Sequence, residues 1–206
     1  MFDTKKILLI LFLLQQVLLT NSTAKGMVTE GFFVNPSLHY LSSERQTKFE
    51  WGTNKENNYR SILNTTLGYS LGSGILFGVK YIHDIYDTNQ DTFWDSDSDG
   101  STKVTSTVFG LGVGFLVDKL ALFISVLSEP YKQDKINNII YSQGSGTMFD
   151  AMYLIDVGGW FIGPQLSWIQ VKYKRYSSTE NNNLEDVFIS MDQTDIQPYL
   201  GVLYSF

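Results

Sequence analysis

Histidine, serine and carboxylate side chains are the groups from which this chain could build a hydrolytic site. It contains two histidines, His39 and His83, and no cysteine. A nucleophilic triad needs a histidine within hydrogen-bond reach of both a serine and an acid. Asp84 directly follows His83, so on a strand their side chains point to opposite faces, and no serine at a matching spacing completes the set. We therefore predict no catalytic residues.

A second candidate for chemistry is an acidic run that resembles the opening of a calcium-binding loop. Asp95, Asp97 and Asp99 alternate with serines and are followed by Gly100, which matches oxygen ligands at alternate positions and a glycine for the turn. The twelfth position is Ser106, where the full motif places a bidentate glutamate, and no helices flank the run. Calcium binding and a solvated acidic loop both stay open, and we predict no metal ligands and no cofactor.

The N-terminus has the pattern of an export signal. Lys5 and Lys6 precede an apolar run over residues 7–19, and Ala24 ends a run of small residues typical of a cleavage site. Gln15 interrupts the run, which is shorter than the roughly 18 apolar residues of a spanning helix, so a retained anchor is the weaker interpretation. We expect residues 1–24 to be a cleaved signal peptide, and 25–206 to be the mature domain.

Charge and cysteine content narrow the classes of function. Removing Lys5, Lys6 and Asp3 with the signal leaves 13 basic and 20 acidic residues, a net charge of −7. A nucleic-acid-binding protein usually carries a basic patch, so we predict no nucleic-acid partner. With no cysteine, an exported chain has no disulfides to stabilise it. No mature segment approaches a helical membrane span, so membrane insertion would require a closed β-barrel.

Alternating polar and apolar residues predict an all-β chain. Segments of suitable length lie at 31–43, 59–71, 75–86, 104–116, 120–130, 146–157, 162–175 and 191–206. Each reaches the roughly 9–11 residues that a tilted spanning strand needs. The sequence therefore predicts eight strands, each crossing a bilayer once.

The connections alternate in length. We expect long loops at 44–58, 87–103, 131–145 and 176–190, and tight turns at 72–74, 117–119 and 158–161. Long loops on one side and short turns on the other are typical of outer-membrane barrels. The first strand's start and the last residue would then both lie on the short-turn, periplasmic side.

Residue types indicate which face of each strand is outside. One face is apolar and free of charge, as in Phe32, Val34, Leu38, Leu67, Phe77, Val79, Leu111, Leu122, Ile124, Phe149 and Ile155. The other is small and sparsely charged, and we place it in the lumen: Asn35, Ser37, His39, Arg60, Asn64, Thr66, Gly68, Ser70, Lys80, Asp84, Ser106, Gly110, Gly112, Ser125, Glu129, Asp150 and Asp156. Some large apolar residues share the lumen: Phe33, Leu76, Ile82, Val108, Phe123, Leu127, Met148, Met152, Leu154 and Leu203.

The seventh segment departs from simple alternation. Its apolar residues occupy one parity as far as Trp168 and the other from Ile169 onward, which predicts a bulge near these two residues. In an eight-stranded barrel side chains fill the interior. Arg60 and Lys80 should therefore pair with lumenal carboxylates, giving a structural polar plug or, as the alternative, a gated ion path.

The last strand carries a family resemblance. The order Tyr199, Gly201, Tyr204 and Phe206 resembles the C-terminal assembly signal of bacterial outer-membrane barrels. With the loop rhythm, the whole mature chain resembles the small eight-stranded barrels, the superfamily of the OmpA transmembrane domain, OmpX and OmpW. The resemblance implies the cell outer membrane of a Gram-negative envelope as location. It also implies outer-membrane lipid, lipopolysaccharide and the barrel assembly machinery as partners.

The chain ends with the barrel, so a periplasmic peptidoglycan-binding domain is not expected. We predict a non-enzymatic protein with roles in envelope structure and surface contact, whose extracellular partner the sequence does not identify. A narrow channel or transporter for small hydrophobic or ionic solutes is the alternative. Some eight-stranded barrels of the family that the chain resembles modify lipid A, so an enzyme using His83 is the second alternative. A soluble lipocalin-type barrel is the rival fold.

Overall fold

The computed structural model describes residues 30–49, 52–91, 102–178 and 185–206. Their strands are β1 (Gly31–Phe49), β2 (Gly52–Ser70), β3 (Ile75–Asp91), β4 (Thr102–Val117), β5 (Leu120–Asp134), β6 (Ile139–Tyr153), β7 (Ile155–Asp156), β8 (Trp160–Ser178) and β9 (Glu185–Ser205). Within these ranges, no helix has the length and apolar character to cross a bilayer. The predicted signal peptide and the run from Asp95 to Gly100 lie outside the described residues.

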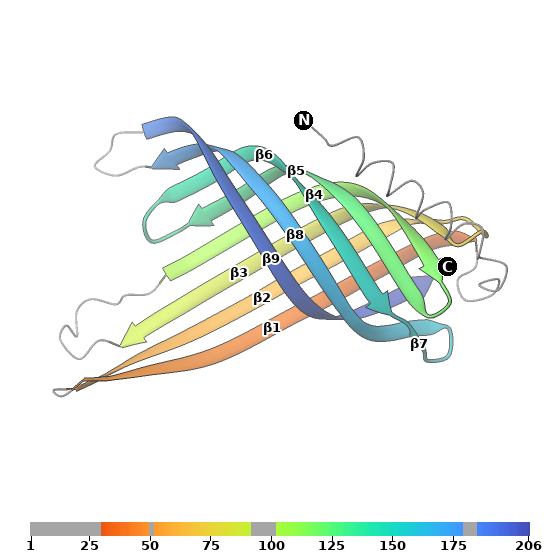
Figure 1. The fold of residues 1–206 in the computed structure, drawn as a ribbon, viewed down its shortest axis with the longest axis horizontal. Helices are drawn as coiled ribbons and strands as arrows, with labels where there is room; N and C mark the ends of the chain where they lie inside the picture. The colour runs from red at the N-terminus through yellow and green to blue at the C-terminus, as the bar shows by residue number, and fades with distance from the viewer. Residues whose placement is uncertain (1–29, 50–51, 92–101, 179–184) are drawn as a thin grey trace, which may run out of the picture.

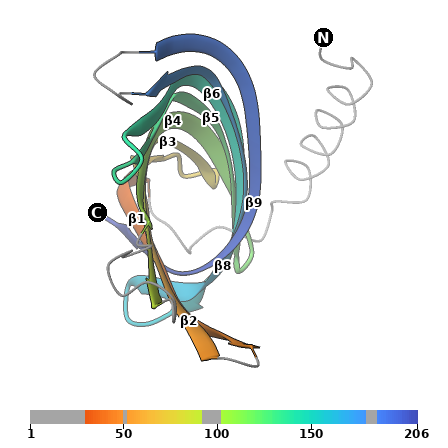
Figure 2. The same ribbon diagram turned by 90° about the vertical axis from the view of Figure 1, so that its left-hand side faces the viewer.

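The strands form one antiparallel sheet that closes into a barrel. Its order is β6-β5-β4-β3-β2-β1-β9-β8-β7, and an additional pairing of β6 with β8 joins the two ends. β7 continues β6 beyond Leu154 and also pairs with β8, so β6 and β7 together occupy one position in the wall. The described residues therefore confirm eight strand positions, and Figure 2 shows them as a ring.

Short turns and long hairpins lie at opposite ends of the barrel (Figure 1). The predicted tight turns are confirmed, since β2 ends at Ser70 before β3 starts at Ile75, and β4 ends at Val117 before β5 starts at Leu120. The four predicted long loops are wrong in their extent. Strands continue into them, as in β1 to Phe49 and β2 from Gly52. The backbone groups of these polar segments are satisfied by hydrogen bonds between the strands, so the strands continue although their side chains have no apolar face to bury.

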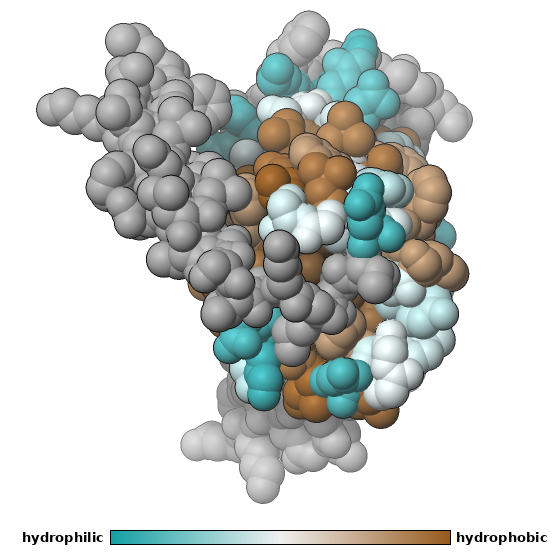
Figure 3. All heavy atoms as spheres, turned by 90° about the vertical axis from the view of Figure 1, so that its right-hand side faces the viewer, coloured by the Kyte–Doolittle hydropathy of each residue, from teal (hydrophilic) through white to brown (hydrophobic). Residues whose placement is uncertain are grey.

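Apolar side chains cover the outside of the barrel. The exposed large apolar residues include Phe32, Leu38, Tyr40, Leu63, Leu67, Phe77, Val79, Phe109, Leu111, Ile124, Val126, Phe149, Tyr153, Leu166, Ile196 and Leu200. Leu67 and Val79 are each more than half exposed, at 57% and 53%. Figure 3 looks from the short-turn end and shows apolar residues gathered on the wall. The predicted polarity of the two faces is confirmed.

The predicted bulge near Trp168 and Ile169 is wrong. β8 alternates regularly there, with Trp168 outside and Ile169, Val171 and Tyr173 buried inside. The register shift in this strand lies further on, between Tyr173 and Arg175. The sequence pattern misled because this part of the lumen is itself apolar, so a run of inward apolar residues looked like a change of face.

Glycines in β4 make room for an aromatic ring inside the barrel. A Cβ atom on Gly112 or on Gly114 would overlap the ring of Phe123. Real Cβ atoms do not approach a ring so closely, so any larger residue would displace the ring or the strand. The alternating glycines of this segment therefore reflect the packing of Phe123 in a narrow interior.

The seam between β1 and β9 is paired over a short stretch only. Its register includes Phe33 opposite Ser205 and Leu38 opposite Leu200, and no pairs beyond Leu38 occur among the described residues. In this register Pro36 faces Val202 but has no N–H to donate. The side chain of Asn35 donates from Nδ2 to the Val202 carbonyl oxygen at 2.8 Å, replacing the missing backbone bond.

The side chain of His39 bonds the seam where the β1–β9 ladder ends. His39 Nδ1 lies 2.6 Å from the carbonyl oxygen of Pro198, another residue without an N–H. A carbonyl oxygen can only accept, so Nδ1 carries the proton. Toward the hairpin end, β1 and β9 diverge (Figure 1), and the seam is held by side chains rather than by a continuous ladder.

Candidate functional site

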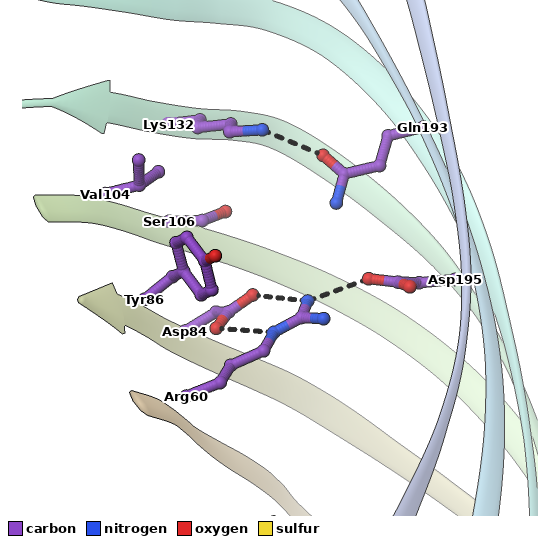
Figure 4. Close-up of a pocket in the computed structure, with 8 residues that line it drawn as sticks. All are labelled: Arg60, Asp84, Tyr86, Val104, Ser106, Lys132, Gln193 and Asp195. Atoms are coloured by element: carbon purple, nitrogen blue, oxygen red, sulfur yellow. Dashed lines mark hydrogen bonds and ion pairs between the residues drawn. The ribbon is translucent and has the colours of Figure 1, made fainter. Parts of the chain in front are cut away.

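The main lumenal cavity lies at the hairpin end of the barrel. It has a volume of about 280 Å³. Its lining residues are Arg60, Asp84, Tyr86, Val104, Ser106, Lys132, Gln193 and Asp195 (Figure 4). We call this space the outer cavity. Its wall includes residues of β2, β3, β4, β5 and β9, so distant parts of the sequence meet there.

Arg60 is the centre of the charge network in the outer cavity. Its Nε donates to Asp84 Oδ1 at 3.2 Å, and its Nη2 donates to Asp84 Oδ2 at 2.8 Å and to Asp195 Oδ2 at 2.7 Å. Gln197 Nε2 also donates to Asp195 Oδ2, at 3.0 Å. A bidentate guanidinium fixes the carboxylate in orientation as well as in charge. One cation therefore ties two acids from β3 and β9 together across the lumen.

Lys132 enters the same cavity through a β-bulge. Between Thr107 and Phe109 the β4–β5 register shifts, and Glu129 on β5 adopts a positive φ of 47°. The extra residue reverses the facing of the rest of β5, so Pro130 is buried and Lys132 points inward. Glu129 is turned outward and exposed, which makes its predicted lumenal position wrong.

A fully buried charge pair lies deeper in the barrel. Lys80 Nζ lies 2.6 Å from Asp150 Oδ2, with 1% and 6% of their side-chain surfaces exposed. Asn64 Oδ1 accepts from Lys80 Nζ at 3.2 Å, and the ammonium lies 5.5 Å from the centre of the Phe123 ring. The predicted pairing of Lys80 with a lumenal carboxylate is confirmed.

Neutral donors complete the environment of the buried carboxylate. Asp150 Oδ1 accepts from Ser167 Oγ at 2.5 Å and from Gln165 Nε2 at 3.1 Å. Gln165 Oε1 in turn accepts from Ser37 Oγ at 2.7 Å. A buried charge is tolerated only when it is paired and its lone pairs are satisfied. We call Lys80, Asp150 and these polar partners the central network.

Apolar layers lie on both sides of the central network. Toward the short turns, one cluster consists of Phe33, Leu76, Leu116, Ala121, Phe123, Met152, Leu154, Phe161 and Leu203. Toward the outer cavity, another consists of Ile62, Ile82, Val108, Leu127, Met148, Ile169, Val171, Tyr173 and Tyr199. Cavities of only about 30 Å³ and 20 Å³ adjoin these layers. Side chains thus fill the lumen below the outer cavity, as the strand number predicts.

The predicted lumenal residues have mixed outcomes. Asn64, Thr66, Ser125 and other small polar residues are buried inside as expected, and so are all ten apolar residues placed there. Asp156 is wrong as an interior residue, because it lies exposed on β7 at the short-turn end and accepts from the backbone N–H of Gly159 at 3.3 Å. Lys132 was missed inside a predicted loop, whereas Asp195 could have been found by extending the inward parity of Gln197 along the last strand.

The two histidines lie on different strands, and neither forms a Ser-His-acid triad among the described residues. His83 is on the outer face, where its Nδ1 lies 3.1 Å from Thr107 Oγ1 and its ring stacks on Tyr81. Asp84 faces the lumen and is bound by Arg60. No group of three or more His, Cys, Asp or Glu side chains suited to a metal occurs within the described ranges.

The four residues of the predicted assembly signal differ in exposure. Tyr199 and Gly201 are buried, and Tyr199 donates from its hydroxyl to Gln197. Tyr204 stacks on Trp160 at 4.3 Å and meets the ring of Phe206 edge-on at 4.9 Å. Phe206 is exposed, and its N–H donates to the Phe32 carbonyl at 2.8 Å. The terminal strand therefore closes the barrel onto β1.

No protein-family model and no curated relative matches the chain. Among solved structures, it is similar to the outer membrane protein AlkL in DMPC bilayers, with 13% identity, a TM-score of 0.48, and coverage of 90% of this chain and 95% of that chain. It is also similar to OmpT, an outer membrane protein of Vibrio cholerae, with 11% identity, a TM-score of 0.33 and coverage of 85% of this chain. The chain spans 52% of the length of OmpT.

Both TM-scores lie below 0.5, so we assign the class from the barrel itself. Its sheet is closed, its exterior is apolar and its interior is polar at the centre. In a bilayer, pairing around the ring satisfies the backbone groups within the ladders, and the side chains of Asn35 and His39 bond seam carbonyls that the short β1–β9 ladder leaves. The apolar exterior suits contact with lipid. The protein is an outer-membrane β-barrel, with short turns at one end and extended hairpins at the other.

Proposed function

We propose that this barrel is a non-enzymatic envelope protein that is closed to solutes and contacts its surroundings through its extended hairpins. The observation that carries this proposal is the filled lumen, in which the central network lies between two apolar layers. Moving an ion through it would require breaking the contact between Lys80 and Asp150 in a site that excludes water. The polar hairpins at the other end of the molecule present the accessible surface.

Planar-bilayer recording tests the closed lumen. The refolded chain is reconstituted, and its insertion is verified by the gel shift of a folded barrel between unboiled and boiled samples. We expect no discrete conductance steps. Regular single-channel steps in the wild type would replace this proposal with the alternative of a narrow channel or transporter. A double variant, Lys80→Ser with Phe123→Ala, removes part of the filling and serves as the control for detecting a leak.

The positions of the histidine and its acidic neighbour support a non-enzymatic role. His83 is on the outer wall and Asp84 is held by Arg60 on the inner wall, so the two cannot act on one substrate group in this arrangement. Overexpression should leave the mass of lipid A unchanged. A mass change that disappears in His83→Ala would overturn this part of the proposal and favour the lipid A-modifying alternative.

We also propose that the chain belongs with the small eight-stranded barrels and is exported with cleavage after Ala24. The apolar segment 7–19 and the terminal pattern ending in Phe206 support this proposal. The barrel assembly machinery, outer-membrane lipid and lipopolysaccharide would then be its partners. N-terminal sequencing of the protein from outer-membrane fractions should give Lys25 as the first residue, whereas Met1 would contradict the cleavage.

A further inference from the structure

The outer cavity holds a second cation besides Arg60, the ammonium of Lys132. Lys132 Nζ has three N–H donors, and its contact in Figure 4 is with the neutral amide oxygen of Gln193 at 3.3 Å. The ion pairs formed in the described part of the chain do not include Lys132. An ammonium facing a cavity of about 280 Å³ therefore has spare donors directed into free space.

The acids in the cavity wall are already committed to another cation. Both oxygens of Asp84 accept from Arg60, and Asp195 Oδ2 accepts from Arg60 and from Gln197. Both acids, together with Asp134, still attract Lys132 electrostatically, but none of the three forms an ion pair with its ammonium in the described part of the chain.

We propose that the outer cavity binds a small anionic group, a phosphate or a carboxylate, on Lys132 and the Gln193 side chain. In Figure 4 the oxygen of the Gln193 amide faces Lys132, and its nitrogen, on the other side of the amide, is a donor available to an anion in the cavity. Charge-assisted hydrogen bonds are the strong ones in proteins. The apolar layer below, with Ile62, Ile82 and Val108, closes the cavity, so the anion stops there rather than passing through.

The same chemistry can come from solution or from a lipid headgroup. Gln193 and Asp195 lie on β9 beyond Leu200, where pairing with β1 has ended. The cavity wall is therefore not sealed by a ladder on this side, and Ile196, which directly follows Asp195, is exposed on the outer wall. A headgroup phosphate of the outer leaflet and a free phosphate are the two sources.

Calorimetry with inorganic phosphate tests the site on the full chain in nanodiscs of zwitterionic lipid. The wild type should show saturable binding, and Lys132→Gln should weaken it at least about tenfold. Lys172→Gln is the matched control, because Lys172 also lies near the hairpin end but faces outward, where it is half exposed beside Asp192. No saturable binding in the wild type, or equal losses in both variants, would overturn the proposal.

Two further measurements make the result independent of how the variant folds. Phosphate should shift the NMR signals of Lys132 and Gln193 in the wild type and leave those of Lys172 unchanged, and the opposite pattern would refute the site. In nanodiscs containing phosphatidylglycerol, a weaker apparent affinity for phosphate would assign a headgroup as occupant. An unchanged affinity would assign the free anion, and either result upholds the anion site.

Discussion

The buried pair of Lys80 and Asp150 gives the sharpest prediction for stability. Asp150→Asn keeps the shape of the side chain but leaves the ammonium of Lys80 with Asn64 at 3.2 Å and the Phe123 ring at 5.5 Å. Lys80→Met leaves the carboxylate with Ser167 and Gln165. Removing one partner of a buried pair costs about 3–5 kcal/mol. The donors that remain on Asp150 should place Lys80→Met at the lower end of that range.

Urea unfolding in lipid vesicles, followed by tryptophan fluorescence, gives the free energy of unfolding. We expect each single variant to lose about 3–5 kcal/mol, and the double variant to lose much less than the sum because no uncompensated charge remains. The surface pair of Lys172 and Asp192 is the control. It is 3.6 Å apart and about half exposed, so Lys172→Met should cost about 0–1 kcal/mol. Additive losses, or single losses no larger than the control, would refute the reasoning.

Three further predictions concern the seam, a hairpin tip and the last residue. Asn35→Ala leaves the Val202 carbonyl without its side-chain donor and should cost about 1–3 kcal/mol in the same unfolding assay; an unchanged stability would contradict the role of Asn35. Burial raises the pKa of Asp134, but the hydrogen bonds from the Asn137 side chain and the nearby backbone outweigh it and leave the pKa below its usual 3.8. The Asp134 carboxylate therefore stabilises the hairpin tip fully above pH 3.8, and this stabilisation is lost as the pH falls through the lowered pKa. An Asp134 pKa at or above 3.8 in an NMR titration would disprove the prediction. Phe206→Ala should reduce the folded fraction in outer-membrane gels while in vitro stability stays nearly unchanged, because the ring is exposed; equal folded fractions would count against an assembly role.

The sequence predicted the faces of the strands well where residue types differ sharply. Leu67 and Val79 alternate with Thr66 and Lys80, and lipid and lumen select opposite chemistries, so parity alone placed all four correctly. Chain closure also followed, because eight spanning strands without a free edge must pair first with last.

Two features escaped because they depend on contacts across the barrel rather than on local pattern. Phe49 was expected in a loop, but β1 extends to it since the neighbouring strand supplies backbone partners for polar residues. Glu129 was placed in the lumen and Lys132 in a loop, and both were wrong because one bulge reverses the facing of every later residue in the strand. Ile169 was also misjudged: it is apolar but points into the lumen, where it packs against other apolar residues.

Site-directed spin labelling tests the central claim that apolar faces contact lipid around a filled interior. The chain has no cysteine, so single cysteines at Leu67, Val79 and Leu111, and at Thr66 and Ser125 as inward controls, report without background. In reconstituted protein, labels at the first three positions should be readily relaxed by oxygen dissolved in the bilayer, and labels at the inward positions should be shielded. Shielded labels at Leu67, Val79 and Leu111, with oxygen reaching Thr66 and Ser125, would contradict the account.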